Sequence, residues 1–157
     1  MKLSPQDRAW LDKVLRAIAA AETGPSETNL ATAPVLTNWS PAISSRGHVI
    51  LWGDVIGHPI LDSDHITTSQ LIAIDLAAGW ARTASRWYRL EKPIAVLEAE
   101  LAESMNGKAK HAGSIQFALS GFANINDPEL LQRLLTTYIA RVREIDAADR
   151  AASDEEE

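Results

Sequence analysis

The chain has 157 residues, of which 46% are hydrophobic and 23% are charged, and its formal net charge is −6. It contains no cysteine, which excludes a disulfide framework and thiolate metal sites, and no apolar run reaches the roughly 18 residues of a membrane span. Because this length suits one domain and the first residues are no signal peptide, we expect a single cytoplasmic domain over residues 1–150, without cofactor or membrane contact.

The first predicted element is a helix within residues 1–24. Ser4 can cap it, Pro5 suits the first helical turn, and Gly24 can end it. Residues spaced by three and four form one apolar face, as in a helix packed on a core: Trp10, Leu11, Val14, Leu15 and Ile18. Residues 26–46 are rich in Ser, Thr, Pro and Asn and are predicted to be mostly loop.

Strand signals concentrate in residues 48–92, where we predict a three-stranded antiparallel meander. The first strand is the β-branched and aromatic run 49–56, in which Gly53 indicates a bulge. The second is 66–74, where mostly apolar positions alternate with mixed ones. Residues 80–90 fit either a third strand or a helix. We favour the strand because Gly79 weakens a helix interior and the Trp and Tyr content suits a sheet.

Residues 93–150 are predicted to form two or three helices, so the fold class is α+β. Pro93 can open the first helix, Ser114 can cap a second, and Asp127-Pro128 is a strong start signal for the last. The last helix has an apolar face wider than one narrow stripe. This face is covered either by the chain's own fold or by the same helix in a homodimer.

The negative charge is concentrated at the C-terminus. Residues 146–157 hold six carboxylates and one arginine, which accounts for −5 of the net −6, so the other 145 residues are close to neutral. Residues 151–157 are predicted to be a disordered acidic tail. Such a tail either keeps the protein in solution or occupies a basic groove in place of nucleic acid.

The segment 80–92 mixes arginines with aromatic rings and holds the candidate partner-binding residues. These are Trp80, Arg82, Arg86, Trp87, Tyr88 and Arg89. Trp, Tyr and Arg dominate protein-binding hot spots, whereas arginines beside rings can also hold phosphates while a base stacks. The structural alternative is that the rings pack in the core and the arginines pair with acids. We favour a protein partner over nucleic acid because the isoelectric point is about 5.2.

A third functional class is a small metal-dependent hydrolase. Its candidate ligands are His58, Asp62, Asp64 and His65, since imidazole and carboxylate both bind zinc or manganese. Their spacing matches no compact ligand motif, so we expect no metal site. The sequence also has no nucleophile elbow, Walker loop or dinucleotide fingerprint.

Three strings carry a resemblance to a known family: Gly57-His58-Pro59, Ile66-Thr67-Thr68-Ser69 and the run GWARTASRWYRL at 79–90. They are similar to a family of small alphaproteobacterial and mobile-element proteins of unknown function, over about residues 1–93. The resemblance implies a bacterial source and no particular activity. We therefore expect a non-catalytic interaction or regulatory protein, associated with a plasmid or phage.

Overall fold

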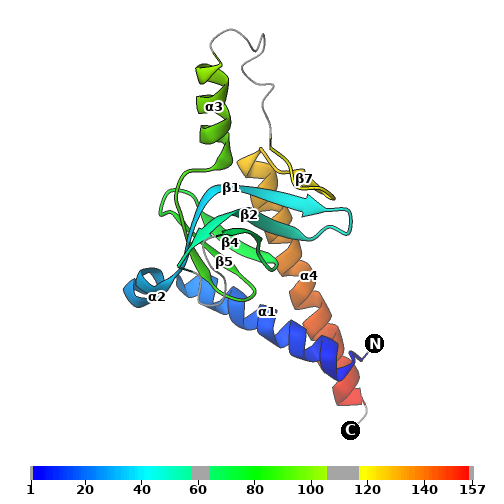
Figure 1. Cartoon of the computed structure of the whole chain (residues 1–157). Helices are drawn as coiled ribbons and strands as arrows, with labels where there is room; N and C mark the ends of the chain where they lie inside the picture. The colour runs from blue at the N-terminus through cyan, green and yellow to red at the C-terminus, as the bar shows by residue number, and fades with distance from the viewer. Residues whose placement is uncertain (1, 58–63, 106–116, 156–157) are drawn as a thin grey trace.

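The computed structural model describes residues 2–57, 64–105 and 117–155, and these form an α+β structure (Figure 1). In chain order the elements are α1 (Pro5–Thr23), α2 (Glu27–Thr32), β1 (Val35–Ser44), β2 (Val49–Ile56), β3 (Asp64–Thr67), β4 (Leu71–Asp75), β5 (Trp80–Thr83), β6 (Trp87–Leu90), α3 (Ile94–Ser104), β7 (Phe122–Asn124) and α4 (Pro128–Glu155). Among these residues, no helix combines the length and the apolar character needed to cross a membrane.

The strands form one mixed sheet in the order β3-β2-β1-β6-β5-β4, with β7 paired to β1. All pairs are antiparallel except β1–β6, which is parallel. The two outermost strands of this order, β3 and β4, are joined by only residues 68–70, which can span roughly 11 Å. The sheet must therefore curl until its two edges approach each other, and β2 and β4 are indeed in contact.

The three-stranded meander predicted from the sequence is wrong, because two of its segments each contain two strands. The segment 66–74 divides at Thr68, whose N–H donates to the Leu51 carbonyl while its hydroxyl accepts from the Leu51 N–H. The segment 80–90 divides at Thr83, whose hydroxyl accepts from the N–H groups of Ser85 and Arg86. Threonine side chains therefore accept the backbone hydrogen bonds at these strand ends, and glycine and proline, the usual turn signals, do not mark them.

The loop predicted for residues 26–46 is also wrong, since this segment contains α2 and β1. The polar residues of β1 lie around a register shift between Thr37 and Ser40, where Asn38 has a φ of 50°. Gly53 faces this bulge from β2. A Cβ on Gly53 would lie 2.9 Å from the Thr37 carbonyl oxygen and from the Trp39 Cα. The bulge predicted at Gly53 thus belongs to the partner strand, and glycine is needed because the two backbones approach closely.

The curled sheet encloses the main core, to which every strand from β1 to β6 contributes. Leu131 and Leu135 of α4 join this core from outside the sheet. Further along, α4 packs against α1 around Val142, together with Ile72 and Ala84 from the sheet. Most of the wide apolar face of α4 is therefore covered by the chain's own fold, although Leu130 stays 40% exposed. Dimerisation through this helix remains a prediction.

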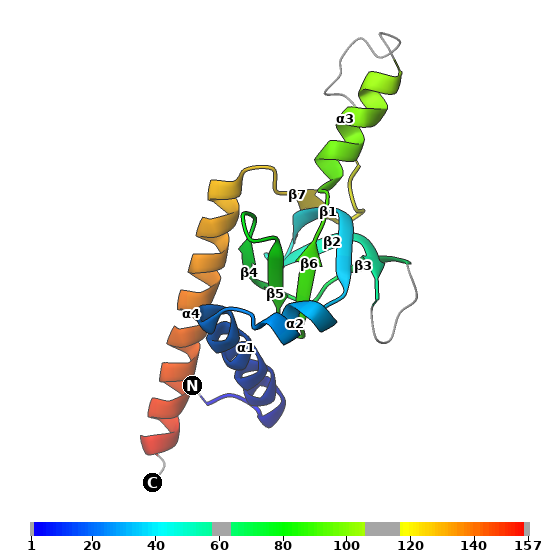
Figure 2. The ribbon, with the colours of Figure 1, turned by 90° about the vertical axis from the view of Figure 1, so that its left-hand side faces the viewer.

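Helices α1, α3 and α4 begin where the sequence predicts, whereas α2 was not predicted and the region between α3 and α4 differs. Ser4 caps α1, and α3 and α4 begin after Pro93 and Asp127. Ser114 lies outside the described residues, and Phe122, expected in a helix, starts strand β7. Figure 2 shows α3 projecting away from the sheet, while α4 runs alongside it. Helix α4 continues to Glu155, so most of the segment predicted to be a disordered tail is helical.

Candidate partner-binding site

The hairpin β5–β6 separates the candidate residues onto two faces. The register places Trp80 opposite Arg89 and Arg82 opposite Trp87, and cross-strand partners share a face. Ala81 and Tyr88 form the intervening pair and point into the core. Four of the six predicted residues thus lie together on the outer face.

Tyr88 is the exception among the predicted residues. It is 3% exposed, and burial raises the pKa of its phenol. Its strand position points the ring into the core, so Tyr88 lies apart from the outer face, and its contact with a partner stays a prediction. Arg86 belongs to neither strand, and lies in the turn between Thr83 and Trp87.

The two tryptophans of the outer face pack on each other and on an arginine. Trp80 and Trp87 meet edge to face with ring centroids 5.3 Å apart. The Arg82 guanidinium lies 5.2 Å from the centroid of a Trp87 ring. Trp87 is only 8% exposed, so it acts as a support for Arg82 and offers little open ring surface.

A small cavity lies beside this face, between α2 and the β5–β6 turn. Figure 2 shows α2 beside the start of β6, and the two elements are in contact. The cavity has a volume of about 220 Å³. Its lining residues are Asn29, Thr32, Ala33, Pro34, Arg82, Ser85, Arg86 and Trp87. The lining thus carries two arginines and no acidic side chain among the described residues.

The neutral polar groups of this cavity already have hydrogen-bond partners. The Asn29 side chain accepts from the Ser26 N–H in a capping box. The Thr32 hydroxyl donates to the Thr28 carbonyl, and the Ser85 hydroxyl bonds to that of Ser69. These bonds help to fix the walls of the cavity. Asn29 and Ser85 act only as acceptors in them, so the Asn29 amide N–H groups and the Ser85 O–H are neutral donors beside the two charged arginines.

The arginines of this region have no acidic partner. Within residues 2–57, 64–105 and 117–155, no ion pair involves Arg82, Arg86 or Arg89. The Nε–H of Arg82 is buried and makes no hydrogen bond there. Burial accordingly lowers the pKa of the Arg82 guanidinium. A buried donor without an acceptor is costly. Because an ion from outside the chain cannot reach this buried atom, the Arg82 groups that could bind an anion are its terminal N–H groups.

The arginines and aromatic rings of this region were predicted from the sequence, whereas the opposite wall of the cavity was not. That wall comes from α2 and the residues after it, in the segment expected to be loop. Its capping box pairs Ser26 with Asn29, whereas the usual signature has Glu or Gln at that position. The pairing of Ser26 with a residue three positions later was the available signal.

Only two of the four candidate metal ligands, Asp64 and His65, lie in the described part of the chain. His58 and Asp62 lie outside the described residues, and Asp64 pairs with Val55 across β2 and β3. The His65 Nδ1 lies 3.0 Å from an Asp54 oxygen, and the other Asp54 oxygen accepts from the Asn38 amide. Bonds from Asn38 and His65 lower the pKa of Asp54. In the described part of the chain, no three such side chains gather to hold a metal.

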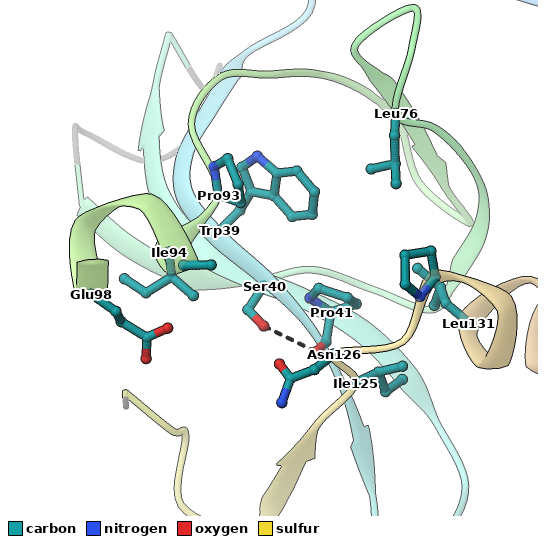
Figure 3. Close-up of a pocket in the computed structure, with 12 residues that line it drawn as sticks. Trp39, Ser40, Pro41, Leu76, Pro93, Ile94, Glu98, Ile125, Asn126 and Leu131 are labelled. Carbon is teal, nitrogen blue, oxygen red and sulfur yellow. Dashed lines mark hydrogen bonds between the residues drawn. The ribbon is translucent and has the colours of Figure 1, made fainter. Parts of the chain in front are cut away.

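A second cavity, of about 240 Å³, lies between β1, the start of α3 and the start of α4 (Figure 3). Its lining is mostly apolar, with Trp39, Pro93 and Leu131 among its walls. The Ser40 hydroxyl donates to the Pro41 carbonyl, and a Glu98 oxygen accepts from the Phe117 N–H. Ser40 and Glu98 are therefore engaged by the chain itself.

A family model described as a family of unknown function (DUF6634) matches residues 1–157. The match includes the C-terminal helices, beyond the residues 1–93 over which the sequence motifs carried a resemblance. No curated protein and no solved structure matches the chain.

Proposed function

The chain belongs to this family of unknown function, and from that premise we propose that it is a non-catalytic protein-interaction protein. Its contact surface is the outer face of the β5–β6 hairpin with the adjoining turn, which we call the arginine face: Trp80, Arg82, Arg86, Trp87 and Arg89. The observation that carries the proposal is the absence of any acidic partner for these three arginines within the described residues. The partner then supplies the carboxylates or other anions.

The state of the rings favours a protein partner over nucleic acid. Binding to single strands depends on open aromatic surfaces on which bases stack. Here Trp87 is nearly buried, and it is packed against Trp80 and Arg82. Clusters of Trp and Arg with supported geometry are typical of protein-binding hot spots, where preordered side chains lose little entropy on binding.

We also propose that the interaction is regulatory, that it takes place in the bacterial cytoplasm, and that the chain is associated with a plasmid or phage. The sequence resemblance and the composition support these points.

The proposal is tested by photo-crosslinking in cells that naturally express the chain. Arg89, which is exposed on the arginine face, is replaced by benzoylphenylalanine, and the full chain is expressed at its native level. We expect a crosslinked protein product that is reduced at least fivefold when Arg82→Gln and Arg86→Gln are added.

The matched control places the same photo-reactive residue at Arg133, an exposed position on α4. Arg133 belongs to α4 and lines no part of the cavity beside the arginine face, so this position should not give the same product. Equal crosslinking at both positions, or a product that is destroyed by nuclease and not by protease, would overturn the proposed protein contact.

A further inference from the structure

We infer that the cavity between α2 and the β5–β6 turn binds the phosphate group of a phosphorylated serine or threonine on the partner. This inference rests on the proposed function, because it names the chemistry that the partner brings to the arginine face.

The size of the cavity fits a single small group. Pockets for drug-sized ligands have volumes of roughly 300–1,000 Å³, whereas this one has about 220 Å³. It lies beside a strand hairpin and a short helix, so a protruding side chain can enter while the partner's backbone stays outside. A side chain that ends in a compact anion meets this requirement.

The charge of the lining favours a dianion over a monoanion. Arg82 and Arg86 contribute two positive charges, and the lining contains no carboxylate. A phosphate monoester carries a charge of about −1.5 to −2 at pH 7 and three acceptor oxygens. A glutamate or aspartate would neutralise only one of the two guanidinium groups, and it has only two oxygens.

The guanidinium groups are the charged donors of the lining. Thr32 already donates within the fold, whereas Asn29 and Ser85 only accept there, so the Asn29 amide and the Ser85 hydroxyl add neutral donors beside them. A guanidinium can present two parallel N–H groups to a phosphate, with higher directionality than an ammonium group. Ala33, Pro34 and Trp87 supply the apolar part of the wall beside the two guanidinium groups.

The test is a ¹H–¹⁵N NMR titration that follows the arginine Nε–H signals of the full chain in chloride buffer at constant ionic strength. The ligands are N-acetyl-O-phosphoserine amide, N-acetylserine amide, N-acetylglutamate amide and inorganic phosphate. We expect saturable shifts of the Arg82 and Arg86 signals with the phosphoserine compound, and an affinity at least tenfold higher than for the glutamate compound. The Arg133 signal serves as the internal control and should not move.

Variants and a change of pH then distinguish phosphoserine binding at this cavity from general electrostatic attraction to the protein surface. Arg86→Gln should weaken phosphoserine binding at least tenfold, whereas Arg133→Gln should leave it unchanged. Because the second phosphate pKa is about 6, affinity should fall as the pH is lowered from 7 to 5. If Arg86→Gln unfolds the chain, Arg86→Lys provides the second variant and should bind more weakly than wild type.

Three results would overturn the inference: no shift with the phosphoserine compound, equal affinity for the glutamate compound, or binding of inorganic phosphate alone. The last would identify a site for the free ion. The crosslinking experiment reports separately on the proposed function. A crosslink that survives while phosphoserine fails to bind removes only this inference, whereas phosphoserine binding without any crosslinked protein removes the proposed protein partner.

Discussion

Two arginine-containing regions of the molecule differ in whether acidic side chains of the chain itself neutralise their positive charge. Arg8, in the first turns of α1, donates to Asp12, Asp146 and Asp149 at 2.6–3.1 Å. These carboxylates raise the pKa of Arg8, with the Asp12 bond as the largest cause and the Asp146 bond next. Arg82 on the arginine face has a buried Nε–H without any acceptor in the described chain. We call the first region the acid clamp: Arg8, Asp12, Asp146 and Asp149.

Arg8, which is bound by acidic side chains of the chain itself, stabilises the fold, whereas Arg82 is available to a partner. Asp149 also accepts from the Leu3 N–H at 2.6 Å, so the acid clamp ties the N-terminus and α1 to the end of α4. In the sequence, Arg8 is an isolated cation near a helix N-terminus, where the helix dipole disfavours positive charge. Its role follows from carboxylates that are 138 and 141 residues away.

The largest expected effect comes from removing the centre of the acid clamp. Arg8→Met should lower the free energy of unfolding by about 1–3 kcal/mol, because bonds to charged groups are lost and Asp146 and Asp149 are left close together without their shared cation. Urea unfolding at pH 7, followed by tryptophan fluorescence, measures this change.

The control for this variant is Arg16→Met, at an exposed position on the same helix. It should change stability by no more than about 0.5 kcal/mol, as is typical of surface substitutions. Equal effects of the two variants would mean that the acid clamp contributes nothing beyond an ordinary surface arginine.

A smaller effect is expected from pH, because the acid clamp depends on ionised carboxylates. Bonds from Arg8 and then Arg150 lower the pKa of Asp146, and the Leu3 N–H followed by Arg8 lowers that of Asp149. An unfolded aspartate has a pKa of about 3.9, so both groups are ionised in both states at neutral pH and their contribution is complete there. As the pH falls below about 4, the unfolded chain binds protons first and stability declines.

Asp146→Asn separates this contribution from that of other acids. The variant should take up fewer protons on unfolding between pH 5 and 3, by a fraction of one proton, as obtained from the pH dependence of urea unfolding. In an Arg8→Met background the same substitution should have a reduced effect. An undiminished effect in that background would show that Asp146 does not act through Arg8.

The helix starts could be predicted because local chemistry determines them. Ser4, Pro93 and the Asp127-Pro128 pair act over one turn of chain, and each marks a helix start in the structure. The strand count could not be predicted in the same way. Thr68 and Thr83 end strands through hydrogen bonds that depend on the folded geometry, and a threonine in an isolated sequence favours continuing a strand.

For the candidate site, composition identified the arginines, but the backbone register decided which residues act together. Trp87 and Tyr88 are adjacent aromatic residues, and the sequence makes both candidates for the contact surface. Because side chains alternate along β6, the two rings lie on opposite faces of the sheet. The acidic C-terminus shows the same limit. In the sequence, Asp146 and Asp149 are part of the acidic stretch 146–157, whereas in the structure they form ion pairs with Arg8 in the acid clamp.

The smallest expected effect is on stability when the arginine face loses its buried donor. Arg82→Met keeps an apolar stem against Trp87 and removes an Nε–H whose burial without an acceptor opposes folding. The lost cation–π contact is worth about 0.5–1 kcal/mol and works in the other direction. We therefore expect a free energy of unfolding within about 1 kcal/mol of wild type, measured by urea unfolding at pH 7 in phosphate-free buffer. A loss as large as that of Arg8→Met would show that Arg82 supports the fold as the acid clamp does, and the contrast between the two regions would fail. An unchanged or higher stability would sharpen the contrast, because a charge that the fold does not need is one that a partner can use.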